Sequence, residues 1–564
     1  MKPMHLAGPA ALCTFLLAPP AMHAQSVMGD SAALRQLRLD VYTLADDSME
    51  GREVGTQGEL MARDYLVKRF RQVGLAPKGD DGGYTQAFQF QDLPHRGTDN
   101  TLQLGRNHLK LGEDFYPLGY SANAQVLTRV ARCGYGIVAP EKGRDDFEGV
   151  EVKDRAACMS ISSPDGIHPH SAWLAYNDLR TRINAAVERG ANAVIFFNDD
   201  PDKAEDPAEE FRMKLQPATV PVVFLTRSGS KKLGQDGDPV VIHTDIVRPE
   251  LTGYNVVGFL GHGKPYTVVI GAHYDHWGHG GEGSLYRGKE PQIHNGADDN
   301  ASGVATMLQL AADLQHLPNT GNNNYLFIAF SGEEKGLYGS SAWTKHPTVP
   351  IDSLNYMINM DMVGRVDSTG HMGINGVGTS PAWAVVGQVR AGGLKIKTTE
   401  SGIGPSDHTS FYLQDVPAIH FFSGSHEDYH KPSDDADKIN YPGMLRTARY
   451  IEELITLLND STKLTFTKTA DADTADAPRF SVTLGVVPDY MYDGKGMRID
   501  GVSEDKPAAL AGLRKGDVVV RLGGHDVPDM MGYMKALGMF KKGDAAEVIV
   551  LREGKEVKAT VHFK

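Results

Sequence analysis

Apolar residues recur with a helical period at the start of this chain and with a strand-like period further on. In residues 31–125 the helical spacing is set by Leu34, Leu37 and Leu39, and then by Leu60, Ala62, Leu66 and Phe70, with Lys and Arg between them. Gly74 follows as a helix stop. The pattern predicts two helices, and the polar, Gly-rich segment SMEGREVGTQGE between them can reach a cleft.

Short β-branched runs replace this pattern from about residue 126 to residue 248. The runs alternate with turns and with one helical stretch: Ala156–Ile161, Ala193–Phe197 and Val220–Leu225, with the helix at Leu179–Arg189. The earlier pattern resumes at Asn255, and an apolar strand at Thr267–Ile270 leads into GAHYDH. Residues 126–248 are therefore expected to form an α+β module inserted into a larger, discontinuous domain of residues 31–125 and 250–460.

The C-terminal part has a third pattern. Residues 463–478 are rich in Thr, Ala and Asp and have almost no apolar side chains after Phe466, which predicts a linker. Residues 479–564 predict a small β-rich domain. Its strands are expected near 497–502, 517–522, 546–552 and 556–563, and its short helix near 529–539.

The composition is that of a globular protein with several domains. The 564 residues exceed what one hydrophobic core normally supports, and 41% of them are hydrophobic and 23% charged. The net charge is −14 and no basic stripe occurs, which argues against a nucleic-acid partner.

The N-terminus has the three parts of a secretory signal peptide. Lys2 is followed by an apolar run from Leu6 to Ala18 and then by small residues, so residues 1–24 are expected to be a signal peptide cleaved after Ala24. The alternative is a membrane anchor, but the run is short for a bilayer and contains Pro9. We expect export, to the periplasm or the medium, with no membrane span in the mature chain.

Two cysteines remain after removal of this segment, Cys133 and Cys158. In an oxidising compartment they can form a disulfide bond if their Cα atoms lie close enough. The alternative is a pair of buried free thiols, and the sequence leaves both open.

Acids and histidines follow one another in the central part of the chain at the ends of apolar runs or in Gly-rich turns. They are His273, Asp275, Asp299, Glu333, Glu334, Asp361 and His430. Open α/β sheets place their ligand-binding groups at strand ends. Two imidazoles with several carboxylates match the donor set of two zinc ions, with one carboxylate to bridge them. The sequence therefore predicts a two-zinc hydrolase site.

Each position also has a plainer interpretation. Asp299 precedes the apolar stretch NASGVATMLQLAADL and can serve as an N-cap, which alone explains it equally well. Glu333 and Glu334 follow a buried strand at Tyr325–Phe330, and adjacent side chains in an extended segment point to opposite sides. One carboxylate can then bind metal while its neighbour handles a proton.

The interpretation of Asp361 and His430 as ligands rests on the segment around Asp361 and on the place of His430 in the ordered set. Asp361 ends the apolar segment LNYMINMDM, where a lone carboxylate is costly unless it is paired or bound to metal. His430 is one of 21 histidines and is distinguished by its place in the ordered set. His276, His279 and His294 are expected to lie outside the ligand set or to face solvent.

These motifs together resemble the secreted two-zinc aminopeptidase family, which also contains glutamate carboxypeptidase and transferrin-receptor relatives. The series is GAHYDH, GADDNASG, GEEKGLYGS, NMDMVG, SDHTSF and DYHKPSDD. The resemblance covers residues 31–125 and 250–460. It implies an α/β fold of the zinc-exopeptidase type, with a mixed central sheet flanked by helices.

The resemblance also implies a role for each site residue. Asp299 matches the bridging ligand; His273 and Asp361 match the ligands of one zinc, and Glu334 and His430 those of the other. Glu333 matches the general base, and Asp275 the acid that orients the first histidine. Tyr429 matches a tyrosine that stabilises the oxyanion in several members. Ser406, Asp407 and His408 match a loop-ordering motif, with Ser406 as an N-cap and not a nucleophile.

Two accessory modules carry resemblances of their own. The inserted module, with ERGANAVIFFND and ATVPVVFLT, resembles the protease-associated domain. The C-terminal domain, with VSEDKPAALAGLRKGDVVVRLGG, resembles a bacterial-type PDZ domain. Such domains bind a peptide or protein C-terminus as an added strand beside the loop equivalent to residues 483–486. Pro488 removes one donor from that strand, so a docking or lid role is an equal alternative.

The sequence thus predicts an exported exopeptidase with two Zn²⁺ per chain, most consistent with an aminopeptidase acting on peptide substrates. In the expected mechanism a hydroxide between the zinc ions attacks the first peptide carbonyl, and Glu333 transfers the proton. The alternatives are a carboxypeptidase or a glutaminyl cyclase on the same fold, and a non-catalytic binding protein that uses its accessory modules.

Overall fold

The computed structural model describes residues 29–564, apart from 167–170, 174–175, 177, 200–216, 282, 289, 460, 470–481, 489–491, 493–494, 503–505, 529 and 564. The expected signal peptide, residues 1–24, lies outside this part. None of the described helices combines the length and the apolar character needed to cross a bilayer.

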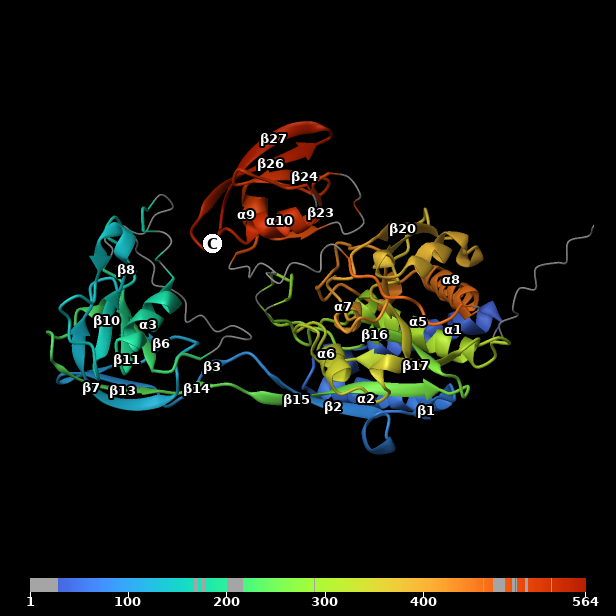
Figure 1. Ribbon diagram of the computed structural model, residues 1–564, viewed down its shortest axis with the longest axis horizontal. Coiled ribbons are helices and arrows are strands. Elements are labelled where there is room, and N and C mark those ends of the chain that lie inside the picture. The colour runs from blue at the N-terminus through green and yellow to red at the C-terminus, as the bar shows by residue number, and fades with distance from the viewer. Residues whose placement is uncertain are drawn as a thin grey trace, which may run out of the picture.

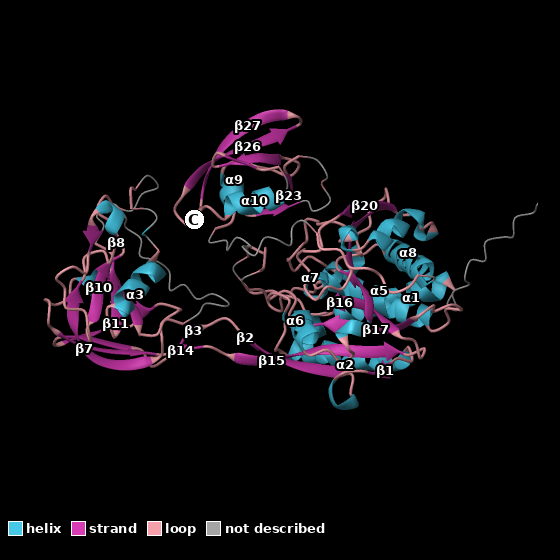
Figure 2. Ribbon diagram, viewed as in Figure 1, coloured by secondary structure: helices cyan, strands magenta, loops and turns pink. Residues whose placement is uncertain are grey.

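A nine-stranded mixed sheet is the centre of the largest domain (Figures 1 and 2). Its order is β1-β15-β17-β16-β18-β21-β19-β20, with β2 also paired to β15. The strands are β1 Ala76–Pro77, β2 Thr85–Gln91, β15 Glu250–Leu260, β16 Tyr266–His273, β17 Asn323–Phe330, β18 Leu354–Met360, β19 His371–Asn375, β20 Lys395–Thr399 and β21 Ala418–Phe422. The four strands β17, β16, β18 and β21 are parallel to one another. Their carboxyl ends therefore meet at one edge.

The central strands are buried on both faces because helices cover each side. In β17, for example, Tyr325, Phe327 and Ala329 face one hydrophobic cluster, while the residues between them face another. Near-continuous apolar runs are what parallel strands require in such a position. The helices are α1 Asp30–Leu44, α2 Gln57–Gln72, α5 Gly303–Leu314 and α8 Tyr441–Asn459 around the first cluster, and α6 Tyr338–Lys345 and α7 His408–Tyr412 around the second. The predicted α/β fold with a mixed central sheet flanked by helices is confirmed.

A second, eight-stranded sheet forms the inserted module, at the left of Figure 1. Its order is β5-β4-β13-β7-β10-β11-β12-β6. The strands are β4 Thr101–Leu104, β5 Asn107–Leu109, β6 Phe115–Pro117, β7 Ala124–Arg132, β10 Ala156–Ser160, β11 Ala193–Phe197, β12 Val222–Leu225 and β13 Pro239–Thr244, with helices α3 Leu179–Glu188 and α4 Arg227–Ser230. Short ladders join β3 His95–Arg96 to β14 Ile246–Val247, and β8 Val138–Ala139 to β9 Arg144–Asp145.

The second sheet begins at Thr101, earlier than the expected boundary at residue 126. Strand β4 pairs with β13, which follows it by more than a hundred residues. A local sequence pattern cannot predict a pairing between strands so far apart. Cys133 and Cys158 are both free and buried. They belong to clusters on opposite faces of this sheet, because Cys133 packs with Ala157 and Met159, and Cys158 with Ala156.

The C-terminal domain has a six-stranded sheet and its own hydrophobic core. Its elements are β22 Val486–Pro488, β23 Met497–Val502, α9 Pro507–Leu510, β24 Val518–Leu522, β25 His525–Asp526, α10 Met530–Leu537, β26 Ala545–Arg552 and β27 Lys555–His562. In the expected linker, residues 463–469 pack against the largest domain. Leu464 and Thr469 are buried there, and the Phe466 ring lies 5.4 Å from that of Tyr412.

Candidate metal centre

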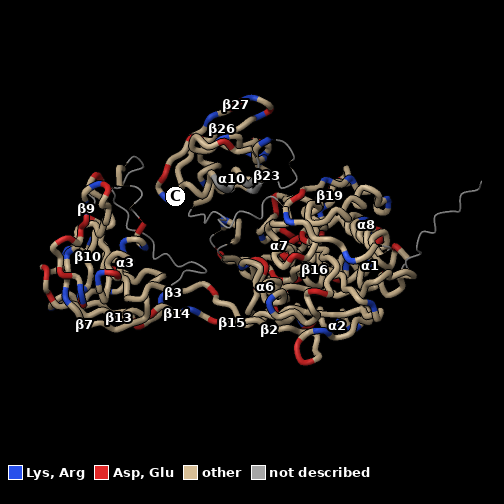
Figure 3. The backbone as a smooth tube through the Cα atoms, viewed as in Figure 1, with Lys and Arg blue, Asp and Glu red and all other residues tan. Residues whose placement is uncertain are grey.

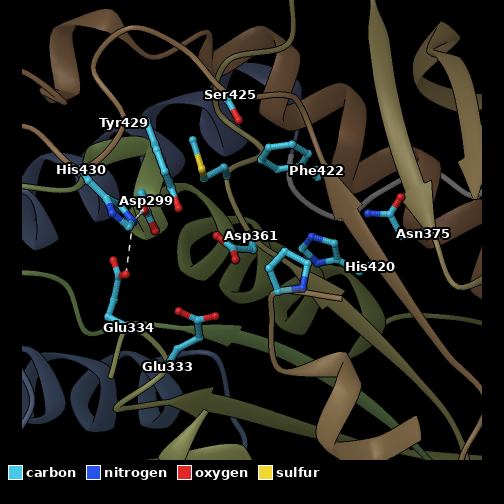
Figure 4. Close-up of a pocket in the computed structure, with 12 residues that line it drawn as sticks. Asp299, Glu333, Glu334, Asp361, Asn375, His420, Phe422, Ser425, Tyr429 and His430 are labelled. Carbon is cyan, nitrogen blue, oxygen red and sulfur yellow. Dashed lines mark ion pairs between the residues drawn. The ribbon is translucent and has the colours of Figure 1, made fainter. Parts of the chain in front are cut away.

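The parallel strands deliver the predicted site residues to one edge of the central sheet. His273 ends β16, Glu333 and Glu334 follow β17, Asp361 follows β18, and His430 follows β21. Acidic positions gather there, near the α7 and β16 labels of Figure 3. Figure 4 shows the side chains of Asp299, Glu333, Glu334, Asp361 and His430 around one pocket.

The first group of donors contains His273, Asp299 and Asp361. The Nε2 atom of His273 lies 3.2 Å from Asp361 Oδ1 and 3.4 Å from Asp299 Oδ1. All three side chains are largely buried, and neither His273 Nε2 nor Asp361 Oδ1 has a hydrogen-bond partner among the described residues.

The second group uses the other oxygen of Asp299. His430 Nε2 lies 3.2 Å from Asp299 Oδ2 and 3.2 Å from Glu334 Oε2. His276 forms a compact donor group with the same two carboxylates, with its Nδ1 atom 2.6 Å from Glu334 Oε1 and 3.8 Å from Asp299 Oδ2. His276 and His430 thus both approach this pair of carboxylates. Asp299 therefore faces His273 with Oδ1 and both His430 and His276 with Oδ2, so its carboxylate lies between the two groups, as a bridging ligand would.

This donor set fits zinc. Donors about 2.0–2.2 Å from a tetrahedral zinc ion are about 3.3–3.6 Å apart, and they are imidazole nitrogens and carboxylate oxygens. The observed separations of 3.2–3.4 Å agree with this spacing. A buried Nε2 atom without a hydrogen-bond partner, as in His273, is also what a metal ligand offers.

The surroundings stabilise positive charge at the same place. Burial disfavours a charged imidazole, yet the carboxylates of Asp361 and Glu333 raise the pKa of His273 well above its ordinary value. Likewise, against the effect of burial, Glu334 and Asp299 raise the pKa of His430 to about 10.

Asp299 is not the N-cap of the helix that follows it. Ser302 is the N-cap of α5, and the N–H of Gly303, the first residue of the helix, donates to Asn300 Oδ1, as does the N–H of Met362. The backbone at Asp299 is extended, with φ −104° and ψ 91°, and this turns its carboxylate away from α5 toward the histidines. The interpretation of Asp299 as only a cap is therefore wrong.

A buried aspartate supports the loop that carries Asp299. Asp434 Oδ2 accepts hydrogen bonds from the N–H groups of Asp298 and Asp299, at 2.9 and 3.0 Å. The side chain of Asp298 is held in turn by His426, 3.1 Å away, and by the N–H of Gly364. The sequence interpretation missed Asp434, although it lies in DYHKPSDD, only four residues after His430.

The two adjacent glutamates differ in protonation. Burial, with Asp361 and Glu334 adding to it, raises the pKa of Glu333 well above its ordinary value. Glu334 is equally buried, but His430 and His276 overcome burial and the repulsion of Asp299 and lower its pKa to about 2. The pKa values of the two neighbouring carboxylates are therefore shifted in opposite directions.

Asp275 lies beside the first histidine. Its backbone carbonyl is 3.2 Å from His273 Nδ1, and its Oδ1 atom is 3.7 Å from the same nitrogen. The same Oδ1 atom accepts a hydrogen bond from the N–H of Glu333. Asp275 therefore contacts both the first histidine and the segment of the adjacent glutamates.

Tyr429 lines the pocket, and its hydroxyl group points into it (Figure 4). Its ring stacks on that of His430, with centroids 3.8 Å apart. The other lining residues outside the donor set are Met362, Asn375, Pro405, His420, Phe422 and Ser425. The pocket wall is therefore neutral and partly apolar beyond the carboxylates.

The SDHTSF segment packs behind the pocket. Ser406 Oγ accepts a hydrogen bond from Asn359 at the end of β18, and no side-chain cap begins α7, so the expectation of a Ser406 N-cap is wrong. Asp407 is fully buried, and burial raises its pKa to about 7. His408 stacks on His420, and neither of its ring nitrogens has a hydrogen-bond partner among the described residues, so these residues form no nucleophile triad.

The second histidine of GAHYDH was not predicted to belong to a donor group. His276 is buried beside Glu334, and its Nε2 atom lacks a hydrogen-bond partner in the described part of the chain. His294 is buried nearby, with its ring 6.4 Å from that of His276, whereas His279 is exposed. The only signal in the sequence that could have placed His276 in a donor group is its position directly after Asp275.

Family models match two parts of this chain. The model of peptidase family M28 matches residues 255–455, and the PDZ domain model matches residues 476–563.

Similar proteins also occur among curated sequences and solved structures. The "Uncharacterized protein YfbL" of Escherichia coli K12 is 31% identical over 241 residues, which span 37% of this chain and 71% of that protein. The "Probable lipoprotein aminopeptidase LpqL" of Mycobacterium tuberculosis is 26% identical over 398 residues, 66% of this chain and 70% of that protein. The crystal structure of "BSAP, a zinc aminopeptidase from Bacillus subtilis" aligns with a TM-score of 0.43 and 20% identity, over 77% of this chain and 95% of that one.

Proposed function

Because this chain belongs to peptidase family M28 and is a zinc-dependent hydrolase with a C-terminal PDZ domain, we propose that it is an exported, two-zinc aminopeptidase. The predicted family resemblance and PDZ domain are thereby confirmed. The number of metal ions, the roles of the single residues and the peptide end that is cleaved form the proposal.

Two groups of residues are proposed to hold the zinc ions. His273 and Asp361 complete one site and Glu334 and His430 the other, with Asp299 between them. Zinc at this place supplies Lewis-acid chemistry, which polarises a carbonyl oxygen and makes water acidic enough to react near neutral pH.

Glu333 is proposed to carry the proton. Its carboxylate is buried beside the pocket, and surrounding carboxylates raise its pKa, so it can take a proton from the attacking water and return it to the leaving amine. Asp275 is proposed to orient the imidazole of His273 through its contacts at Nδ1.

Tyr429 is proposed to donate a hydrogen bond to the oxyanion that forms on the substrate carbonyl. Its hydroxyl points into the pocket that the donor groups line. A donor that is held in place before the reaction stabilises charge that develops during it. Stacking on His430 restricts the Tyr429 ring.

The charge of the pocket is the observation that favours the amino end of a peptide. Among the described residues that line it, four are carboxylates and none is Lys or Arg. A carboxypeptidase needs a cation for the C-terminal carboxylate of its substrate. The four carboxylates are those proposed to hold zinc and to carry the proton, so it is the lack of Lys or Arg among the described lining residues that favours the amino end.

Export and the accessory modules belong to the same proposal. The signal-like N-terminus and the lipoprotein relative support a periplasmic or secreted location. The inserted module, proposed to be a protease-associated domain, is expected to shape substrate access. In the PDZ domain β22 is an edge strand, where a C-terminal peptide can add, although Pro488 offers no N–H.

A side-by-side assay tests this function. The purified protein is loaded with zinc and given an aminoacyl amide, the N-acetylated form of the same amide, a peptide with C-terminal glutamate, and an N-terminal glutaminyl peptide. We expect chelator-sensitive hydrolysis of the free aminoacyl amide but not of its N-acetylated form, no release of C-terminal glutamate from an N-blocked peptide, no cyclisation of the glutaminyl peptide, and two zinc ions per chain by metal analysis.

The other outcomes separate the rival functions. Release of glutamate from a blocked peptide indicates a carboxypeptidase, and cyclisation with one bound zinc indicates a glutaminyl cyclase. Absence of any turnover in the zinc-loaded protein indicates a binding protein. Hydrolysis of the N-acetylated amide as fast as the free one contradicts recognition of the amine.

A further inference from the structure

One short segment of the N-terminal region packs against two loops of the metal centre: the loop after β16, which carries His273, and the loop before α5, which carries Asp299. It is the turn Asp47–Arg52, between α1 and α2. Glu50, Gly51 and Arg52 all have left-handed φ angles, of 47°, 66° and 54°. For Glu50 and Arg52 this conformation is unfavourable, so the surrounding contacts must hold it.

The side chain of Arg52 is fully buried and donates hydrogen bonds to carbonyl groups of three segments. Its Nε atom donates to the carbonyl of Tyr274, at 2.7 Å. Its Nη atoms donate to the carbonyls of Asn295 at 2.7 Å, Gly296 at 3.0 Å and Leu44 at 2.5 Å. Tyr274 lies between His273 and Asp275, and Gly296 begins the turn that carries Asp299. One guanidinium group therefore links the backbones of two ligand loops.

The backbone of the same turn adds a second set of links. The carbonyl of Arg52 accepts from the N–H of His276, and that of Gly51 from the N–H of Gly278. Gly51 packs so closely that a Cβ atom there would lie 2.5 Å from the carbonyl oxygen of Gly278 and 2.7 Å from that of His294. The turn thus fits between the two loops with no room for a side chain at residue 51.

The start of α2 connects this turn to the third ligand loop. Glu59 is buried and accepts hydrogen bonds from the N–H of Gly55, from the N–H of Tyr254 and from Ser331 Oγ. Ser331 lies two residues before Glu333. The segment from Asp47 to Glu59 therefore contacts the loops of β16, of α5 and of β17.

The chemistry of the guanidinium group explains why arginine is used here. Its planar fork presents several donors in fixed directions, whereas the ammonium group of lysine is a compact point charge. Burial lowers the pKa of Arg52 to about 10, partly offset by the charges of Asp299 and Asp275. The group thus remains charged at neutral pH, and its field also offsets repulsion among the site carboxylates.

We propose that Arg52 is a positioning residue of the metal centre: by holding the carbonyls of Tyr274, Asn295 and Gly296, it sets the spacing between the loop of His273 and the loop of Asp299. This inference rests on the proposed two-zinc function. It assigns a role to the N-terminal segment, which supplies none of the proposed ligands.

The substitution Arg52→Lys tests this role, because it retains the charge and removes the fork. We expect a folded protein with zinc affinity about 10–100-fold weaker, as for other residues that support metal ligands. We also expect kcat to fall at least about tenfold at saturating zinc with KM within about twofold, and shifted visible bands in the cobalt-substituted protein.

Arg182→Lys is the matched control. Arg182 is a fully buried arginine of the inserted module that also donates to backbone carbonyls, those of Ser160, Ser162 and Tyr176. Burial lowers its pKa to about 10 as well. A loss of thermal stability is expected in both variants, but only Arg52→Lys should change zinc affinity and the cobalt spectrum.

Unchanged zinc affinity, kcat and cobalt spectrum in folded Arg52→Lys would overturn the proposal, and so would equal changes in Arg182→Lys. If Arg52→Lys does not fold, Gly51→Ala replaces it, since the added methyl group displaces the turn and leaves the guanidinium in the chain; an unchanged cobalt spectrum then overturns the proposal. A wild-type protein that binds no zinc contradicts the proposed function instead, so the two failures are distinguishable.

Discussion

Glu333 and Glu334 are neighbours in the sequence, yet their surroundings shift their pKa values in opposite directions. Both are buried, so burial raises the pKa of each. The difference comes from what each carboxylate faces: Glu334 faces His430 and His276, and Glu333 lies near the carboxylate of Asp361. The proposed proton carrier and the proposed metal ligand are thus adjacent residues with opposite surroundings.

Glu333→Gln is expected to retain both zinc ions and to lose about 10²–10⁴-fold in kcat, because the amide cannot accept the proton. Metal analysis and steady-state kinetics on an aminoacyl amide check this. Glu427→Gln is the control, since Glu427 is exposed on the same loop as His430. Full activity of Glu333→Gln would contradict its role.

At the scale of secondary-structure elements, the packing of α7 against β21 shifts the pKa values of two histidines, His408 and His420. The rings of His408 and His420 stack with centroids 4.7 Å apart and an interplanar angle of 8°. Burial lowers the pKa of His408 well below its ordinary value and that of His420 to about 4. Between pH 6.5 and 4 the unfolded chain therefore binds protons that the folded chain does not.

The sign of the pH dependence follows from this difference. The contribution of these histidines to stability is complete above about pH 6.5 and falls as the pH drops toward 4, by about 1.4 kcal/mol per pH unit for each group. His408→Phe removes one of the two groups and keeps a stacked ring.

Its free energy of unfolding, measured without metal by denaturant titration, should fall by about 1 kcal/mol less than that of the wild type between pH 6.5 and 5.5. Equal losses in both proteins would show that His408 is protonated in the folded state.

At the scale of the whole molecule, three bodies have separate hydrophobic cores. The core of the PDZ domain shares no residue with those of the other two bodies, and every proposed ligand lies between residues 273 and 430. Residues 463–469 remain attached to the peptidase domain, where the N–H of Thr469 donates to the Tyr412 hydroxyl.

A chain that ends after Thr469 is therefore expected to hydrolyse an aminoacyl amide with kcat/KM within about twofold of the full chain, since a remote module supplies no transition-state contact. A chain that ends after Ser461 is the comparison, and its thermal unfolding should shift downward because it lacks the buried Leu464 and Thr469. Loss of activity in the longer truncation would show that the PDZ domain contributes to the site.

Much of the candidate site could be predicted because each residue follows a strand or precedes a helix. The apolar runs before His273 and Glu333 are buried strands, and parallel strands bring their ends to one edge. The order of the motifs along the chain indicated all three residues of the first donor group and Asp299 and Glu334 of the second, but not His276. The early start of the second sheet at Thr101 could not be found in this way, since β4 pairs with β13, far along the chain.

By itself the sequence determined the chemistry at the ends of the strands: which side chains are apolar, which carry donors, and in what order they occur. Only the tertiary structure decided which groups support them. Arg52 contacts the carbonyl of Tyr274 across 222 residues, and Asp434 holds the N–H of Asp299 across 135. A local pattern of apolar and polar residues predicts the secondary structure of one segment. A hydrogen bond between distant loops forms only when the packed sheet and helices have brought those loops together.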